Sequence, residues 1–295
     1  MLALTIFISI TMVFEGEFHR NIDPDVNYYE EFFDDLTCDN NNSTQYFSFS
    51  EYNSFCKNDY KNFIKILGYN IRSFNANFNQ FSCMLDHSNL PEILVLSETW
   101  FYSSKTEEIP EFNSYHTVRD RNRSGGVSIY VKNGITAEQL SEFCFSNLDI
   151  EICSVKFKIG NETFFVVGIY RPHDGSIENF QNTLDELLNH SVFQNKKVIV
   201  LGDLNINLLH GNDPTIIQFS SLMHSNHFFP VITKPTRFSV SSESATLLDH
   251  IWLNSPTSYF SGIILNDATD HLPTIRSELT YSYSKSTNLC ILTFI

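Results

Sequence analysis

Residues 196–206 read KKVIVLGDLNI, and this stretch decides how the rest of the chain is interpreted. The run from Val198 to Leu201 is apolar without interruption, which is typical of a strand covered on both faces. Asp203 and Asn205 follow directly, and both side chains should point to one face if the backbone stays extended. We therefore predict a buried strand that carries two polar groups to a sheet edge, where loops build sites.

The same arrangement recurs along the chain. Further strands are predicted in FIKILGYNI (63–71), EILVLSE (92–98), GGVSIYVK (125–132), residues 152–159, TFFVVGIY (163–170), ATLLDHIWL (245–253) and LPTIRSEL (272–279). Polar residues at or next to the ends of these runs are Asn70, Glu98, Tyr170, Asp249 and the pair Asp270-His271. Each one alone is weak evidence, because a polar residue after a strand is usually a turn or a cap. Together their types suit one chemical task.

The predicted fold class is α/β (α+β). Helices are expected at 74–87 and 176–190, where apolar residues recur on one helical face. Many strands with few helices between them indicate two mixed β-sheets packed face to face with helices outside, because continuously apolar strands must be covered on both sides.

The chemical task is phosphodiester hydrolysis. A phosphate diester repels hydroxide, so an enzyme must neutralise charge, activate a water and stabilise the leaving oxygen. Mg²⁺ takes oxygen ligands from one or two carboxylates plus waters, and Glu98 and Asp270 could supply them. Asp203 and Asn205 could orient the water. His271 could bind the phosphate or act as a base, with Asp249 fixing its tautomer.

Six blocks now make the pattern specific. They are YNIRS (69–73), LSETW (96–100), GIYRP (168–172), GDLNIN (202–207), TLLDHIW (246–252) and TDHLP (269–273). In this order they resemble the endonuclease/exonuclease/phosphatase superfamily. RSGGVSIYVK (123–132) and KPTRF (234–238) are similar to the apurinic-like endonuclease domain of non-LTR (LINE-type) retrotransposons in particular.

The resemblance implies a four-layered, DNase I-like α/β sandwich and a Mg²⁺ (or Mn²⁺) cofactor. It implies a metal region formed by Asn70, Glu98, Asp203, Asn205 and Asp270. It implies a phosphate region formed by Asn70, Tyr170, Arg171 and His271, with Asp249 paired to His271. Which group is the general base stays open. One departure is Arg72, which stands where apurinic endonucleases carry an acid, so metal affinity should rest more on Glu98.

The chain divides into three predicted regions. Residues 1–60 are expected to be a poorly ordered acidic arm with a short apolar start, because they hold 11 acidic and two basic residues of a chain with net charge −15. Residues 61–280 form the predicted catalytic domain, and 281–295 a tail without family resemblance, so we expect a truncated or domesticated copy or a misjoined gene model. The apolar start is too short to span a membrane and is a poor signal peptide, which favours a nuclear or cytoplasmic location.

Several conspicuous residues are interpreted as structural. The cysteines form no zinc spacing and are expected to be reduced thiols in or near the core. Trp100, Trp252 and His250 are expected to pack in the protein, and Gly125-Gly126 to permit a tight entry into a strand. The short basic cluster Arg119, Arg121 and Arg123 suits either DNA backbone contact or a solvated loop.

Three functions are consistent with these residues. The first is a DNA endonuclease that nicks one strand and leaves a 3′-hydroxyl, acting as a monomer on DNA without a dedicated protein partner or a membrane. The second is a phosphoesterase of the same fold that acts on inositol phosphates or sphingolipid. The third is an inactive retroelement relic or binding module. The overall negative charge counts against tight non-specific binding of nucleic acid.

Overall fold

The computed structural model describes residues 44–58, 64–84, 90–102, 105–119, 124–239, 244–255, 259–265, 269 and 274–278. The apolar start, most of the acidic arm and the tail 281–295 lie outside these described residues. So does the pair Asp270-His271.

The strands and helices alternate much as the sequence predicts. The strands are β1 (Gln45–Phe47), β2 (Ile64–Asn70), β3 (Ile93–Ser97), β4 (Phe112–Thr117), β5 (Val127–Lys132), β6 (Thr136–Gln139), β7 (Phe145–Ser146), β8 (Glu151–Ile159), β9 (Glu162–Tyr170), β10 (Lys197–Asp203), β11 (Phe229–Pro230), β12 (Arg237–Ser239), β13 (Ser244–Thr246), β14 (Asp249–Leu253), β15 (Tyr259–Ile264) and β16 (Thr274–Glu278). The helices are α3 (Phe49–Asn58), α4 (Phe74–Met84), α5 (Ile177–Leu188) and α6 (Pro214–Ser225), with a 3₁₀ turn at Ser141–Phe143.

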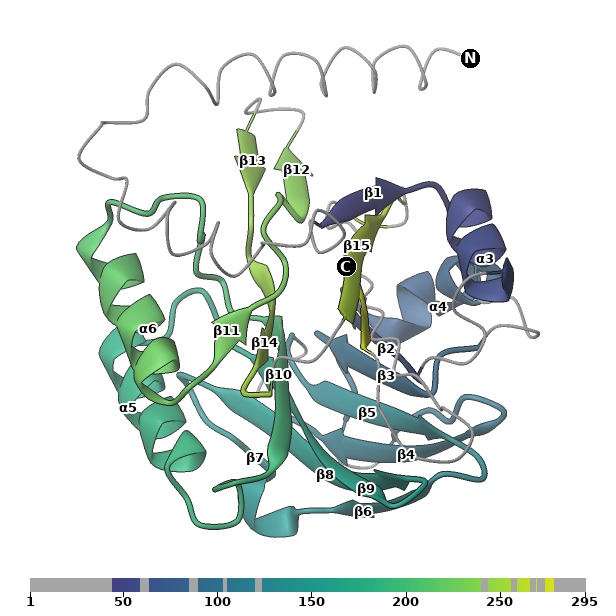
Figure 1. Ribbon diagram of the computed structural model, residues 1–295, viewed down its shortest axis with the longest axis horizontal. Coiled ribbons are helices and arrows are strands. Elements are labelled where there is room, and N and C mark those ends of the chain that lie inside the picture. Colours follow the sequence, from purple (N-terminus) through teal and green to yellow (C-terminus); the bar gives the residue numbers. More distant parts are fainter. Residues whose placement is uncertain are drawn as a thin grey trace. The chain divides into compact units, whose positions relative to one another are not determined.

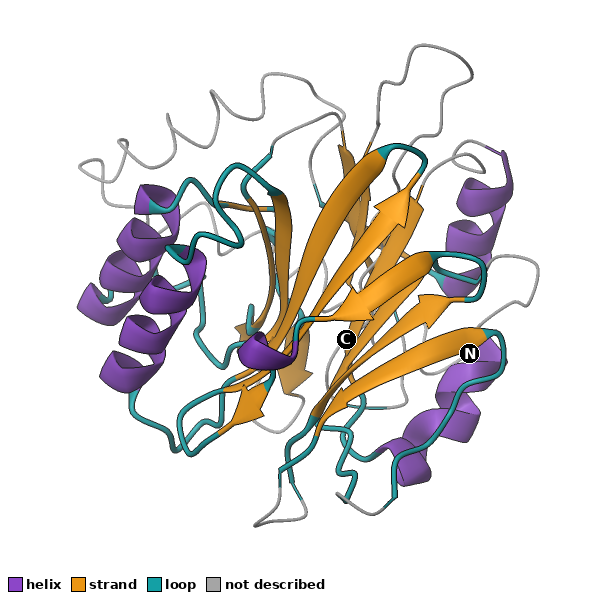
Figure 2. Cartoon of the chain, turned by 90° about the horizontal axis from the view of Figure 1, so that it is seen from below, coloured by secondary structure: helices purple, strands orange, loops and turns teal. Residues whose placement is uncertain are grey.

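Within the described residues, two sheets of mixed strand direction form the centre of the fold (Figure 1). The first has the order β1-β15-β16-β2-β3-β5-β4. The second has the order β11-β14-β10-β9-β8-β6, with β7 paired to β8. Figure 2 shows the strands between two groups of helices, so the predicted four-layered sandwich is confirmed. A separate hairpin pairs β12 with β13.

The period of two along each strand explains how the layers pack. In β10, Ile199 and Leu201 belong to the core between the sheets, whereas Val198 and Val200 belong to the core under α5 and α6. The other central strands divide their side chains in the same way. Each fully buried Val, Leu or Ile contributes roughly 2 kcal/mol relative to exposure, which explains why these strands are apolar on both faces.

The outer helices follow from local signals. Ser176 caps α5, because its side chain accepts a hydrogen bond from the Asn179 amide, and the buried face of α5 includes Phe180 and Leu184. Asp213 caps α6 in the same way and is followed by proline at the first helical position. The predicted helices are confirmed within the described residues, although 85–87 of the first one lie outside them. No helix in the described parts of the chain is long and apolar enough to cross a bilayer.

One expectation is wrong in part. Residues 44–58 were assigned to a poorly ordered arm, yet β1 pairs in parallel with β15 and α3 follows it. Phe47 and Tyr52 are buried in the core on the outer face of the first sheet. The three-residue strand is too short to show a period, and its partner strand lies near the other end of the chain, so local sequence gave no signal for the pairing.

Candidate active site

Four polar residues of the second sheet stand in one row. In the strand register, Asp203 lies opposite Tyr170 on one side and Asp249 on the other, and Tyr170 also lies opposite Glu151. Asp203 continues the same alternate positions as Ile199 and Leu201, so its side chain faces the space between the sheets. The sheet therefore brings polar groups from β8, β9, β10 and β14 to one edge.

Asn70 links this row to the first sheet. Its Nδ2 donates to Oε1 of Glu98 at 2.9 Å and to Oδ2 of Asp203 at 2.8 Å. Its Oδ1 accepts the backbone N–H of Arg72 at 3.1 Å, and the residue is 1% exposed. One buried amide thus holds two carboxylates from opposite sheets, because each amide hydrogen points to a different oxygen.

Glu98 lies just beyond the end of β3, in an unusual backbone conformation. Glu98 and Trp100 have φ values of +51° and +57°, in the left-handed region that non-glycine residues seldom adopt. The Trp100 indole donates to Oε2 of Glu98 at 3.3 Å. Trp100 is therefore half-buried beside the site and is not the core anchor that we expected, whereas Trp252 is one, at 1% exposure.

Asp203 and Asn205 meet by a turn and not along an extended strand. The Asn205 amide N–H donates to Oδ1 of Asp203 at 3.0 Å, and Asn205 has a φ of +49°. Its side-chain Nδ2 donates to the Arg171 carbonyl at 2.8 Å, which leaves Oδ1 as the atom for a ligand. The condition for both side chains to point to one face, an extended backbone, is not met, because β10 ends at Asp203 and the chain turns out of the sheet.

Tyr170 keeps its proton at neutral pH. Burial, the nearby negative charges of Glu98, Asp203 and Glu151, and a hydrogen bond with Glu98 all raise its pKa well above the ordinary value. The hydroxyl is therefore a hydrogen-bond donor at the edge of the sheet. A neutral donor beside carboxylates suits contact with an anionic oxygen of a substrate.

Arg171 has most of its donors occupied. Its guanidinium donates to the carbonyl oxygens of Leu204, Pro172, Gly175 and Asn205 at 2.7–3.2 Å. Burial lowers its pKa, against the raising effect of Asp203. These contacts tie the end of β9 to the loop after β10, so they favour a positioning role. The phosphate contact expected for Arg171 stays a prediction.

Asp249 is buried and held in place. Its Oδ2 accepts the Thr236 hydroxyl at 2.8 Å, and the Thr236 oxygen accepts the backbone N–H groups of Leu248 and Asp249. Its expected partner His271, and Asp270, lie outside the described residues. His250 is confirmed as a packed residue, 1% exposed and bonded through Nε2 to the Ile206 carbonyl at 2.8 Å.

Sequence reasoning missed Glu151, which is fully buried at the same edge. Burial raises its pKa to about 7, while the Gly126 N–H and Arg119 oppose that shift and Glu98 adds to it. The predicted site residues follow apolar strands, whereas Glu151 begins a strand. Because β8 runs antiparallel to β9, its first residue reaches the edge where β9 ends. A search of strand starts in predicted hairpins would have found it.

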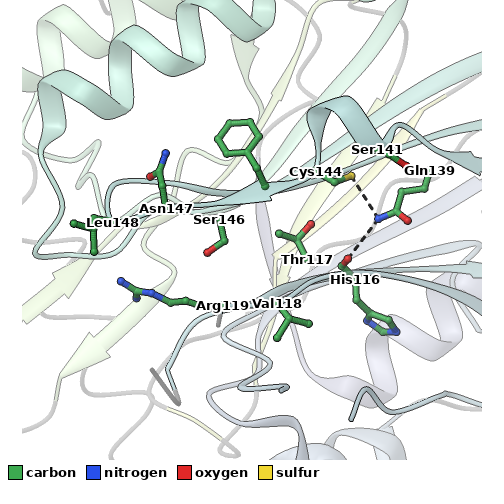
Figure 3. A pocket seen from close by; sticks show the side chains of 11 residues that line it. His116, Thr117, Val118, Arg119, Gln139, Ser141, Cys144, Ser146, Asn147 and Leu148 are labelled. Atoms are coloured by element: carbon green, nitrogen blue, oxygen red, sulfur yellow. Dashed lines mark hydrogen bonds between the residues drawn. The ribbon is translucent and has the colours of Figure 1, made fainter. Parts of the chain in front are cut away.

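A cavity of about 700 Å³ lies beside Arg119, between residues 116–119 and 139–148 (Figure 3). Cys144 lines it, while Cys153 is buried behind, and the Gln139 amide contacts both sulfur atoms, at 3.5 and 3.9 Å. Both cysteines are free thiols, as expected. The other four cysteines lie at positions whose side chains the structure does not describe.

The described side chains fit Mg²⁺ better than zinc. No group of three or more His, Cys, Asp and Glu side chains suited to a metal occurs in the described part of the chain. Mg²⁺ needs only one or two carboxylates, with water completing its shell. The Glu98 carboxylate accepts hydrogen bonds from Asn70 and Trp100 and is also bonded to Tyr170, and with about four acceptor sites it still has room for a cation. The Asp203 oxygens likewise accept from Asn70 and Asn205.

Comparison with protein families then decides the relationship. Residues 64–271 match the model described as the endonuclease/exonuclease/phosphatase family, which is more than half of the chain. The chain belongs to the endonuclease/exonuclease/phosphatase family. The family and its solved relatives are hydrolases that act on phosphate ester bonds. Comparison with curated protein sequences gave no match.

Solved structures share the fold at low identity. The endonuclease domain of TRAS1, a telomere-specific non-LTR retrotransposon, has 12% identity and a TM-score of 0.57, with 72% of this chain and 95% of that chain covered. The catalytic domain of APE2 from Xenopus laevis has 18% identity and a TM-score of 0.57, with 78% and 93% covered. The 3′-phosphatase NExo from Neisseria, bound to a product DNA hairpin, has 16% identity and a TM-score of 0.53, with 73% and 99% covered.

Proposed function

We propose that the chain is a Mg²⁺-dependent endonuclease that nicks one strand of DNA by attack of water on a phosphodiester. The observation that carries the proposal is the Asn70 amide, which holds Glu98 and Asp203 together across the two sheets beside the Tyr170 hydroxyl. The endonuclease domain of a retrotransposon and a DNA-bound phosphatase share this fold, which supports DNA as the substrate and a retroelement origin.

The metal region consists of Asn70, Glu98, Asp203, Asn205 and, from outside the described residues, Asp270. A bound divalent cation would neutralise phosphate charge and stabilise the leaving oxygen. Arg72 is an exposed residue and leaves Glu98 as the main acidic ligand of the first sheet. Both oxygens of Glu98 are oriented by hydrogen bonds, from Asn70 and Trp100, so the carboxylate is held ready for the cation.

The substrate phosphate would lie between the two sheets. The Tyr170 hydroxyl would donate a hydrogen bond to a phosphate oxygen, because its raised pKa keeps the proton in place. Asp203 and Asn205 would orient the attacking water: hydrogen bonds from Asn70 and Asn205 hold the Asp203 carboxylate in place, and the Asn205 Nδ2 is bonded to the Arg171 carbonyl, which points its Oδ1 to a ligand. His271, paired with Asp249, would contact the phosphate from the opposite side or take a proton.

A plasmid assay tests the proposal. Purified protein is incubated with supercoiled plasmid and Mg²⁺, and we expect open circles whose nicks a DNA polymerase can extend from 3′-hydroxyl ends. Chelation by EDTA and the substitution His271→Ala should each stop nicking. If the wild-type protein leaves the plasmid supercoiled at every Mg²⁺ or Mn²⁺ concentration, the endonuclease proposal is wrong.

The same preparation separates the alternatives. Phosphate release from inositol phosphates or a sphingolipid substrate, without nicking, would identify the phosphoesterase function. Absence of both activities, together with no Mg²⁺ binding by calorimetry, would identify an inactive relic. Gel filtration with light scattering tests the proposed monomer. Cell fractionation tests the proposed nuclear or cytoplasmic location.

A further inference from the structure

Glu151 belongs to the second sheet, but its carboxylate contacts the first. Oε2 accepts the backbone N–H of Gly126, which lies just before β5. Oε1 lies 3.4 Å from Nε of Arg119, which follows β4. The next residue of β8 adds a second connection, because the Thr117 hydroxyl donates to the Ile152 carbonyl at 2.7 Å. The start of β8 therefore holds the segment between β4 and β5 from across the sandwich.

That segment in turn holds the backbone around Glu98. The Trp100 N–H donates to the Gly125 carbonyl at 2.8 Å, and the Thr99 N–H donates to the Gly126 carbonyl at 3.3 Å. Residues in the left-handed region, as Glu98 and Trp100 are, are strained and persist only when their surroundings fix them. The two glycine carbonyls provide part of that fixation.

The two glycines are required by the close approach of Glu151 to Gly125 and of Thr99 to Gly126. A Cβ on Gly125 would lie 2.5 Å from Oε1 of Glu151, and one on Gly126 would lie 2.6 Å from Oγ1 of Thr99. Both glycines have positive φ values, of +103° and +91°. Gly125-Gly126 thus does more than open a strand, since it lets a buried carboxylate and the Glu98–Trp100 segment contact the same short stretch of backbone.

The position of Glu151 in the register makes it relevant to the site. It lies opposite Tyr170, and the charges of Glu98 and Glu151 both act on the Tyr170 hydroxyl. A buried ion pair is a poor source of stability, because desolvation of its charges offsets their attraction. The Glu151 carboxylate is better explained by its effect on the position of the Gly126 backbone than by a contribution to folding stability.

We propose that Glu151 is a positioning residue for Glu98: it fixes Gly126, and through the Gly125-Gly126 backbone it fixes the left-handed segment that presents Glu98 to the metal region. This inference rests on the proposed function for its activity readout, although metal binding tests it separately. It assigns Glu151 no contact with substrate or metal. Its effect should therefore appear in metal affinity and kcat more than in the KM for DNA.

The experiment compares Glu151→Ala, Glu151→Gln and Glu151→Asp with a matched control, Glu162→Ala. Glu162 lies at the far end of the same β8–β9 hairpin and pairs with Lys197 at 2.9 Å. Each protein is measured by calorimetric titration with Mg²⁺, by nicking kinetics for kcat and KM, and by thermal unfolding. Gln keeps an acceptor oxygen for the Gly126 N–H, whereas Ala lacks one and Asp is one methylene too short.

We expect Glu151→Ala and Glu151→Asp to weaken Mg²⁺ binding and to lower kcat about 10-fold to 100-fold, with KM for DNA within about twofold of wild type. Glu151→Gln should recover most of both losses, and Glu162→Ala should behave as wild type. If Glu151→Ala does not fold, Glu151→Asp supplies the same readouts. Rescue by Gln separates positioning of the Gly126 amide from a role of the negative charge.

Two results would overturn the inference. One is a folded Ala or Asp variant with wild-type Mg²⁺ affinity and kcat. The other is an equal loss in Gln and Ala, which would assign the effect to charge. A wild-type protein that binds Mg²⁺ in a Glu151-dependent way but nicks no DNA would refute the proposed function and leave this inference standing. Nicking by wild type with unchanged Glu151 variants would refute this inference alone.

Discussion

The two sheets contribute to the candidate site in different ways. Tyr170, Asp203 and Asp249 stand in one row of the second sheet, where ladder hydrogen bonds between strands set their spacing. Glu98 of the first sheet lies beyond the end of its strand, on left-handed backbone that is held by hydrogen bonds from other segments. One half of the site is fixed by regular structure and the other by individual contacts.

This difference shows where the site is vulnerable. A row within a sheet tolerates change at a neighbouring side chain, because backbone hydrogen bonds keep its geometry. A segment fixed by a few contacts loses its geometry when one contact is removed. The Asn70 amide joins the two halves, so its removal should disturb the geometry of both Glu98 and Asp203.

The largest effect is expected from Asp203→Ala, which removes the centre of the second-sheet row. The carboxylate accepts hydrogen bonds from Asn70 and Asn205 and is proposed to orient the water. We therefore expect the rate of nicking to fall by about 10³-fold with little change in thermal stability. Single-turnover cleavage of an oligonucleotide duplex measures it. Asp185→Ala, on the exposed face of α5, is the control and should retain wild-type activity. An active Asp203→Ala would remove the second-sheet half from the mechanism.

The next effect comes from breaking the connection between the halves. Asn70→Ala removes both donated hydrogen bonds, and we expect kcat to fall about 10-fold to 100-fold, because Glu98 and Asp203 lose their shared orientation. Combined with Glu98→Ala, the losses should be less than additive, since both changes affect one unit. Kinetics of the two single variants and the double variant test this. Full additivity would mean that Asn70 acts independently of Glu98.

The sequence predicted the half built by regular structure well. Uninterrupted apolar runs identified β2, β3, β9 and β10, and their ends placed Asn70, Tyr170 and Asp203 at one edge. The single strand predicted over 245–253 is wrong, because the structure divides it into β13 and β14, and Asp249 begins β14. Alternation works there because a strand fixes the direction of every second side chain. The same rule failed at Asn205, where the backbone leaves the strand and the left-handed conformation turns its amide toward Arg171.

The contacts of the other half could not be read from the sequence. Trp100 and Glu98 are near neighbours in the chain, but their hydrogen bond depends on two left-handed residues that no period reveals. Glu151 acts on a segment of the opposite sheet, and only the packing of the sheets brings the two together. Pairing of β1 with β15 was missed for the same reason. Such contacts are long-range and belong to no repeating pattern.

Arg171 tests whether the second-sheet half needs contacts beyond its ladder. Arg171→Lys keeps the charge but cannot reach four carbonyl groups with one ammonium, so we expect a loss of about 3 kcal/mol in the free energy of unfolding. Urea denaturation measures it. Arg171→Gln, which removes the charge, tests the phosphate contact: a positioning role leaves the salt dependence of DNA binding unchanged, whereas a phosphate contact would reduce the slope of log K against log salt by about one. That second result would restore the phosphate role expected from the sequence.

The smallest effect on stability at neutral pH is expected from substitution of His250, which tests whether water is excluded from the second-sheet half of the site. Its Nε2 bonds to the Ile206 carbonyl and its Nδ1 accepts the Trp252 indole N–H, so the neutral ring is specified on both sides. Burial lowers its pKa to about 4, while the Ile206 and Leu247 carbonyls and Asp249 oppose the shift. The unfolded chain binds this proton near the ordinary value of 6.5, well before the folded protein does.

Stability should therefore fall as the pH drops from about 6.5 to 4, by about 3 kcal/mol in total from this residue, and should be fully present above that window. His250→Gln keeps a donor for the Ile206 carbonyl but does not titrate. Unfolding free energies of both proteins at several pH values give the difference, so carboxylates common to both cancel. In the variant, the free energy of unfolding should fall less steeply with decreasing pH, because the contribution of His250 is absent, even if the variant is less stable at neutral pH. If the free energy of unfolding depends on pH in the same way in both proteins, water reaches this side of the second sheet and the strand ladder does not exclude it.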